Sequence, residues 1–158
     1  MAMNEKRELL RHTLATLAYR LVRAVAGAPE DFGAFGEAGR TPVSILAHIG
    51  DLIDWGLCLA SGQGGWLQSD PLTWKEEEKR VFAAIAALDN YLASEEPLHT
   101  TEEKLFQGPV ADALTHVGQL AMLRRLAGNK IHGENFYVAT IAVGQVGVEQ
   151  AEPKYLFR

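Results

Sequence analysis

Cysteine is nearly absent from this chain, in which Cys58 is the only one among 158 residues. A single cysteine excludes an internal disulfide and any zinc site built from several thiolates. No uninterrupted apolar run reaches the roughly 18 residues that a transmembrane helix needs. Residues 1–10 are too rich in charge to form the apolar centre of a signal peptide. We therefore expect a cytoplasmic location and no membrane partner.

Basic residues are outnumbered by acidic ones, 15 to 20, which gives a net charge of −5 and a pI near 5.5. An acidic surface repels polyanions, so no nucleic-acid partner is expected. The hydrophobic share of 47% is ordinary for a folded protein, and the chain has the length of one domain. A single domain over residues 1–158 is therefore predicted.

Alternation of apolar and polar residues, which would indicate strands, is missing over any useful length. Apolar residues instead recur every three or four positions, which is typical of helices. Thr41-Pro42 has the pattern of a helix start, and Gly108-Pro109 is expected to open another helix. The predicted helices are long over residues 4–26, 42–60, 73–93 and 109–128, and short over 134–144. The fold class predicted is an all-α antiparallel four-helix bundle with an additional short C-terminal helix.

The second predicted helix carries His48 in line with Ile45, Leu52 and Trp55, at one edge of its apolar stripe. The imidazole therefore faces the interior of the bundle or its rim. It is either a hydrogen-bonded core residue or a metal ligand, and this helix alone does not decide between the two.

The fourth predicted helix carries Asp112 and His116 four residues apart, so that both lie on one face, with Gln119 close beside them. A carboxylate and an imidazole at this spacing can reach the same divalent cation. The alternatives are an Asp–His hydrogen bond within the helix, or an aspartate that caps the turn after Pro109. Burial of two histidines and an aspartate is costly without partners, and one ion shared with His48 would satisfy all three. Such a site leaves coordination positions open for water or substrate.

These segments resemble the DinB-like superfamily, also described as damage-inducible or YfiT-like metal-dependent proteins. The resemblance is carried by Ile45-Leu-Ala-His48, by Asp112-Ala-Leu-Thr-His116-Val-Gly-Gln119 and by the closing Leu123-Arg-Arg-Leu-Ala-Gly128. The chain departs from the family pattern at Asp112, where the family has a histidine, and at Val117, where it has an arginine. An aspartate ligand keeps a two-histidine, one-carboxylate set chemically sound.

The resemblance implies a compact four-helix bundle, often a homodimer, that holds one divalent ion, with nickel or zinc expected here. The implied ligands are His48, Asp112 and His116. Characterised relatives include thiol-dependent transferases and isomerases that use low-molecular-weight thiols such as mycothiol or bacillithiol. We therefore expect a metal-dependent enzyme that acts on a small molecule, either an S-transferase or a hydrolase. The alternatives are a non-catalytic small-molecule-binding or stress-associated bundle that has lost the metal, for which the aspartate is the best argument, and a purely structural dimer.

Several other side chains are weaker candidates for a functional role. His132, beside Gly133, is a candidate for the mouth of a pocket. Arg124 and Arg125 suit the C-terminal dipole of their helix, and either is a candidate to hold a substrate carboxylate. We expect Cys58 to be buried and inert, and the three tryptophans to pack the bundle or its loops.

Overall fold

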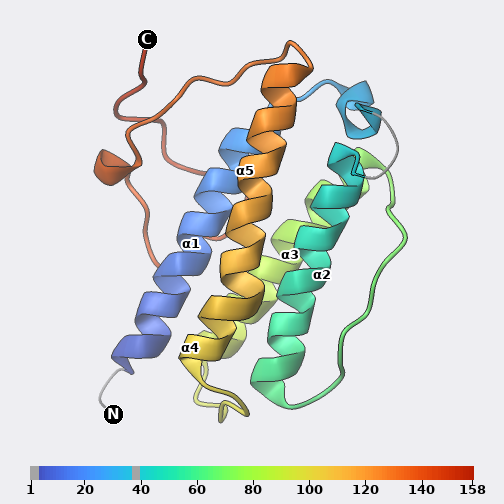
Figure 1. Ribbon diagram of the computed structural model, residues 1–158. Coiled ribbons are helices and arrows are strands. Elements are labelled where there is room, and N and C mark those ends of the chain that lie inside the picture. Colours follow the sequence, from blue (N-terminus) through green and yellow to red (C-terminus); the bar gives the residue numbers. More distant parts are fainter. Residues whose placement is uncertain (1–3, 37–39) are drawn as a thin grey trace.

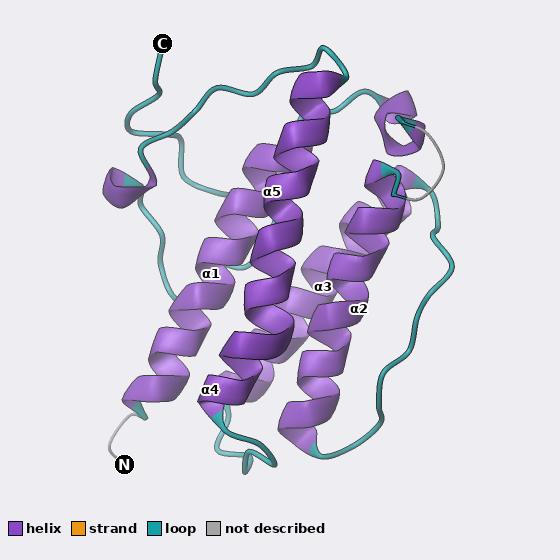
Figure 2. Cartoon of the chain, in the orientation of Figure 1, coloured by secondary structure: helices purple, strands orange, loops and turns teal. Residues whose placement is uncertain are grey.

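The computed structural model describes residues 4–36 and 40–158, and these form four long helices (Figures 1 and 2). The long helices are α1 (Glu5–Val25), α2 (Pro42–Ser61), α3 (Trp74–Ala93) and α5 (Ala111–Leu126). The short elements are α4 (Glu102–Leu105), the π-helical turn η2 (Phe106–Val110) and the 3-10 turns η1 (Glu30–Ala34) and η3 (Phe136–Val138). Within the described residues no strand forms, and only an isolated bridge joins Glu134 to Leu156. The prediction of an all-helical chain is confirmed.

Local capping chemistry explains where α2 and α3 begin and end. The Thr41 hydroxyl accepts a hydrogen bond from the Ser44 amide, and Pro42 follows at the first helical position. Thr73 and Glu76 form a reciprocal capping box at the start of α3. Gly62 ends α2 with a left-handed backbone at φ 70°, which glycine adopts without steric cost.

The last long helix begins earlier than predicted. Helical structure starts at Glu102, where the Thr101 hydroxyl accepts from the Lys104 amide. Gly108-Pro109 therefore lies inside a continuous helical run and does not open it. The proline ring lacks an N–H and clashes with the carbonyl one α-turn before it, and the wider π-helical turn at 106–110 accommodates it.

Helices α2 and α3 lie side by side and run in the same direction. At their shared start, Gly33 packs against both Val43 and Trp74. At their shared end, the His99 amide donates to the Ala60 carbonyl at 3.0 Å. The connection 62–73 therefore runs back along the outside of the bundle, as Figure 1 shows.

Helices α1 and α5 form a second parallel pair, and it runs opposite to the first. The Arg124 guanidinium near the end of α5 donates to the Ala24 carbonyl near the end of α1 at 2.9 Å. The Arg7 guanidinium at the start of α1 donates to the Ser94 carbonyl after α3 at 2.9 Å. The two pairs therefore run in opposite directions, and each pair is internally parallel.

The C-terminal helix predicted over 134–144 does not form, and a 3-10 turn at Phe136–Val138 replaces it. The buried Glu134 carboxylate is held by the Tyr19 hydroxyl and by Arg23 Nε at 3.1 Å, both on α1. The Asn135 side chain accepts from the Tyr137 amide, a local bond that competes with helix formation. These anchors hold the tail in an irregular path over α1.

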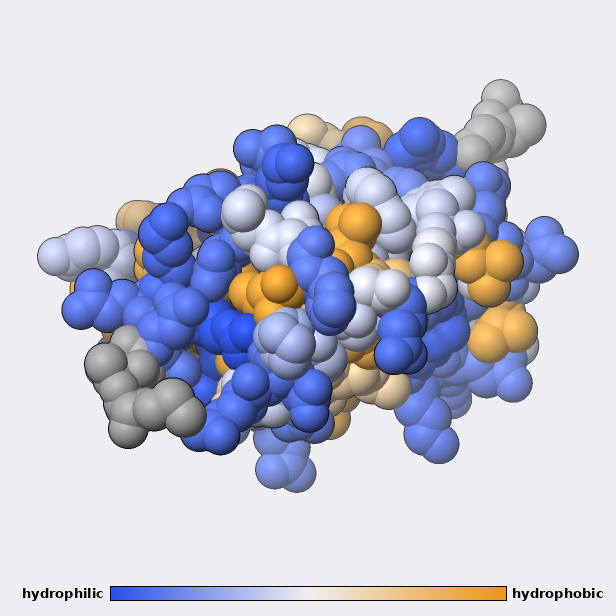
Figure 3. Space-filling view, turned by 90° about the horizontal axis from the view of Figure 1, so that it is seen from below, coloured by the Kyte–Doolittle hydropathy of each residue, from blue (hydrophilic) through white to orange (hydrophobic). Residues whose placement is uncertain are grey.

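Helix α2 is by length and composition apolar enough to cross a membrane, with a mean hydropathy of 1.5. It also carries Asp51 and Asp54, and 56% of its apolar window is buried inside the protein. It contacts both α3 and α5, as a core helix of a bundle does. Seen from the end where α1 begins and α2 ends, the surface is mostly hydrophilic with small hydrophobic patches (Figure 3).

Candidate metal centre

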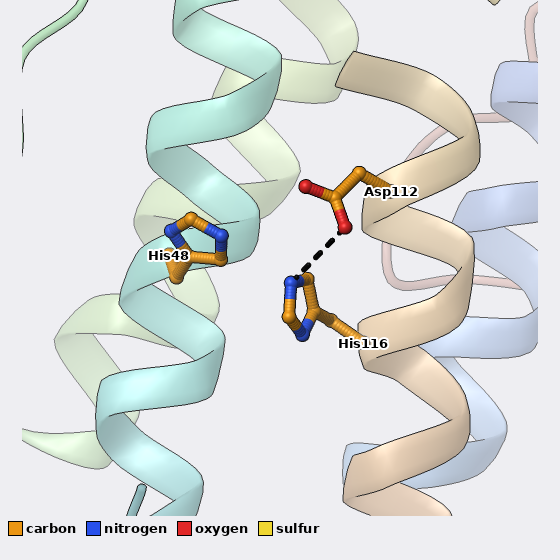
Figure 4. A group of neighbouring side chains, drawn as sticks. All are labelled: His48, Asp112 and His116. Atoms are coloured by element: carbon orange, nitrogen blue, oxygen red, sulfur yellow. Dashed lines mark ion pairs between the residues drawn. The ribbon is translucent and has the colours of Figure 1, made fainter. Parts of the chain in front are cut away.

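The structure brings together the three residues that the sequence singled out. His48 comes from α2, and Asp112 and His116 come from the facing side of α5 (Figure 4). One ligand atom from each residue lies within 4.8 Å of the other two. Because the contributing helices belong to different pairs, the packing of α2 on α5 creates the site.

Asp112 and His116 are stacked one helical turn apart on α5. Asp112 Oδ1 lies 3.3 Å from His116 Nε2, and the side chains are 48% and 7% exposed. The carboxylate therefore lies at the rim of the site, where water reaches it, and the imidazole lies inside. Such a pair offers one hard oxygen and one nitrogen to a common point.

Gln119, one turn further along α5, fixes the imidazole of His116. Its Oε1 lies 2.8 Å from His116 Nδ1. An amide oxygen only accepts, so Nδ1 carries a proton, and in the neutral imidazole Nε2 presents its lone pair toward Asp112. Histidine ligands of metals are commonly oriented in this way by an acceptor on the other ring nitrogen. The sequence placed Gln119 beside the site, and its three-residue spacing from His116 was the signal for this contact.

His48 completes the group from the opposite helix. Its ring centroid lies 4.7 Å from that of His116, with the planes nearly perpendicular at 86°. Burial lowers the pKa of His48 below its ordinary value, and the neighbouring His116 lowers it further, against a smaller opposing effect of Asp112. The imidazole is therefore neutral near pH 7 and has a lone pair to donate.

Trp66, from the connection 62–73, borders the site on the side of His48. Its ring lies edge-on to His48 at 5.8 Å and edge-on to Trp55 at 5.9 Å. The indole is 45% exposed, so it faces both the histidine and solvent. Trp74, in contrast, is buried against Phe32, as expected of a packing residue. Nothing in the local sequence of a glycine-rich connection indicated that Trp66 would reach the site.

The donor set fits a divalent ion. Metal bonds to imidazole and carboxylate are roughly 2.0–2.2 Å long, so two ligands of one ion lie no more than about 4.4 Å apart. The Asp112–His116 separation of 3.3 Å satisfies this limit. The three ligand atoms lie within 4.8 Å of one another, so only a small side-chain movement is needed to bring all of them within it. Two nitrogens and one oxygen suit zinc, nickel or iron and leave positions free for other ligands.

The other candidates from the sequence take different roles. His132 lines a cavity of about 290 Å³ between α1, α5 and the C-terminal tail. Arg124 is 3% exposed and donates to the carbonyls of Ala24 and Ala26, so it stabilises the end of α1 and does not face a substrate site. Cys58 is half-buried near Gly64, where the expectation was full burial.

No protein-family model, no curated protein and no solved structure matches this chain. The resemblance to the DinB-like superfamily accordingly rests on the motif residues in α2 and α5. The chemistry of the site rests on its geometry.

Proposed function

We propose that the protein binds one divalent metal ion through His48, Asp112 and His116 and acts as a metal-dependent enzyme of the DinB-like superfamily. One observation carries this proposal. In the neutral imidazole, the Gln119 contact places the proton on Nδ1 and leaves the Nε2 lone pair facing the Asp112 carboxylate oxygen at 3.3 Å. Two lone pairs at this distance repel unless a metal ion binds between them or Nε2 takes up a proton, and the proposal is that a metal ion fills this position.

His48 supports the same conclusion from the opposite helix. Within the part of the chain that the structure describes, its ring nitrogens make no hydrogen bond to protein, although a histidine at an apolar helix edge usually has one. A shared ion would use this free nitrogen. The competing arrangement is a protonated His116 paired with Asp112, which gives His48 no role.

When bound, the ion would lower the pKa of a water or thiol and offset negative charge on a substrate. The chain's own residues would hold the ion and orient its ligands. Gln119 would fix His116, and Trp66 would shield one side of His48 from water. The exposed Trp66 and the half-buried Trp55 offer an apolar surface to a small-molecule substrate. No side chain at the site stands out as a general base, so transfer to a low-molecular-weight thiol and hydrolysis are both compatible. We also propose that the protein is cytoplasmic and forms a homodimer.

A second candidate is a small-molecule-binding bundle that keeps the fold without the metal. Asp112 favours it, because a carboxylate that is 48% exposed is solvated at little cost when no ion is present. In this case His116 and Asp112 form an ordinary ion pair at the rim of the α2–α5 interface.

Elemental analysis of the purified protein, without a metal-binding tag, separates the two candidates. The proposal predicts close to one nickel or zinc ion per chain after reconstitution, and loss of that ion in His116→Ala. His12→Ala is the matched control, because His12 is exposed on α1 and lies outside the site. Absence of an ion from the wild type after addition of nickel, zinc or manganese would overturn the proposal. Loss of the ion in both variants would mean that surface histidines bind it non-specifically.

A further inference from the structure

A second cavity lies on the other side of α5. It has a volume of about 290 Å³, is bordered by α1, α5 and residues 131–136, and is open to solvent on one side. Successive helical residues are rotated by roughly 100°, so the lining residues Val117, Ala121 and Arg125 form a stripe directed away from Asp112 and His116. The cavity is therefore separate from the candidate metal centre.

Its polar lining is rich in arginine, although the chain as a whole carries a net charge of −5. Arg20 from α1, Arg125 from α5 and His132 from the tail all line it. Among residues 4–36 and 40–158, neither Arg20 nor Arg125 has a carboxylate within ion-pair distance. Three other arginines of the chain, in contrast, are paired with acidic side chains: Arg11, Arg23 and Arg80.

The one acidic residue in the cavity wall is already neutralised. Glu134 is 7% exposed, and its carboxylate accepts hydrogen bonds from the Tyr19 hydroxyl and from Arg23. It is therefore not available to pair with Arg20 or Arg125. Arg20 and Arg125 are exposed, so their positive charge is available to a ligand that reaches the cavity from solvent.

Arg20 is held in place by an aromatic ring. Its guanidinium lies over Phe136 at 3.9 Å from the ring centroid, a cation–π contact that orders the side chain but uses none of its N–H donors. A guanidinium that is positioned in advance binds a carboxylate with less loss of side-chain entropy.

The remaining lining is apolar and includes Val117, Ala121 and Ile131. Apolar walls favour a ligand with a hydrocarbon body and disfavour a compact dianion, whose oxygens would all need donors. A volume of about 290 Å³ lies at the lower end of the range for small-molecule pockets. The ligand must therefore be small.

We propose that this cavity binds a small organic monocarboxylate, whose carboxylate is held by Arg20 and Arg125 and whose apolar body packs against Ala121 and Ile131. The site is independent of the metal centre and does not rest on the proposed enzyme activity. A charge-assisted contact to a guanidinium is the main source of its specificity.

Calorimetric titration of the full chain in the presence of EDTA tests the proposal, because chelation keeps carboxylates from binding through a metal ion. The probes are acetate, hexanoate and phenylacetate, with phenylacetamide as the neutral counterpart of the last. The expected result is binding that strengthens from acetate to the two larger acids and is at least about tenfold weaker for the amide, which corresponds to roughly 1.4 kcal/mol.

Two variants locate the binding. Arg125→Gln is expected to weaken phenylacetate binding about tenfold or more, while Lys79→Gln, which removes the same charge from the exposed side of α3, leaves it unchanged. Ala121→Leu, which fills the cavity, is expected to abolish binding while the helical circular dichroism is retained. No binding of any of the three acids, equal binding of acid and amide, or equal loss in the Arg125 and Lys79 variants would each overturn the proposal.

Discussion

Gln119 Oε1 lies 2.8 Å from His116 Nδ1 and so decides which nitrogen of His116 faces the candidate metal centre. Replacement of Gln119 by leucine removes this acceptor and lets the ring rotate or change tautomer. Loss of such a supporting contact typically lowers metal affinity by about 10–100-fold. Competition titration with a chromophoric chelator should show this loss for Gln119→Leu, with a much smaller change for Gln119→Glu, which keeps an acceptor. Unchanged affinity in Gln119→Leu would mean that the contact does not orient the ligand.

The lowered pKa of His48 predicts a dependence of stability on pH. The folded state resists protonation of this imidazole, whereas the unfolded chain takes up the proton near the ordinary value of about 6.5. Its contribution to stability is therefore complete above that pH and is lost as the pH falls toward the lower folded-state pKa. Denaturant unfolding in EDTA should show a larger loss between about pH 7.5 and pH 5.5 for the wild type than for His48→Gln. Equal losses in the two proteins would contradict the assignment.

The buried Arg124 is predicted to stabilise the junction of α1 and α5. Its guanidinium donates to the carbonyls of Ala24, Ala26 and Asn129, which have no other partner among the described residues at the ends of the two helices. Arg124→Met should lower the free energy of unfolding by about 2–3 kcal/mol, measured by urea denaturation. Arg125→Met, at an exposed neighbouring position, should change it by no more than about 0.5 kcal/mol. Similar effects of the two substitutions would argue against a special role of Arg124.

Asp51 is predicted to anchor the connection 62–73, which carries Trp66. Its carboxylate accepts from the Ser69 amide at 2.9 Å and pairs with Arg80 at 3.1 Å. Asp51→Ala should therefore speed hydrogen exchange of the Ser69 amide, because the amide loses its only acceptor among the described residues. Metal affinity should fall little, because the substitution changes none of the three proposed metal ligands. Slow exchange in the variant would show that other contacts hold the connection.

Much of the fold could be predicted because local signals act within one helix. The caps at Thr41 and Thr73 and the glycine at 62 fix helix ends through bonds that span only a few residues. The sharing of one face by Asp112 and His116 follows from helical geometry alone. These features need no knowledge of tertiary structure.

The features that were missed depend on contacts between distant segments. The directions of α2 and α3 are set by the path of the connection 62–73, which sequence periodicity does not describe. The start of the last long helix was misplaced because Pro109 is tolerated in a π-helical turn. The prediction of a short C-terminal helix was wrong because Glu134 is held by Tyr19 and Arg23 on α1.

X-ray absorption spectroscopy of the nickel- or zinc-loaded protein tests the central claim most directly, because it reports the atoms bound to the ion. The spectrum is expected to contain the multiple-scattering signature of two imidazoles and first-sphere nitrogen or oxygen distances of roughly 2.0–2.1 Å. His48→Ala and His116→Ala should each reduce the imidazole count from two to one, and Asp112→Ala should leave it at two. A spectrum that keeps two imidazoles in the His48 and His116 variants would contradict the claim that these residues, on α2 and α5, hold the ion.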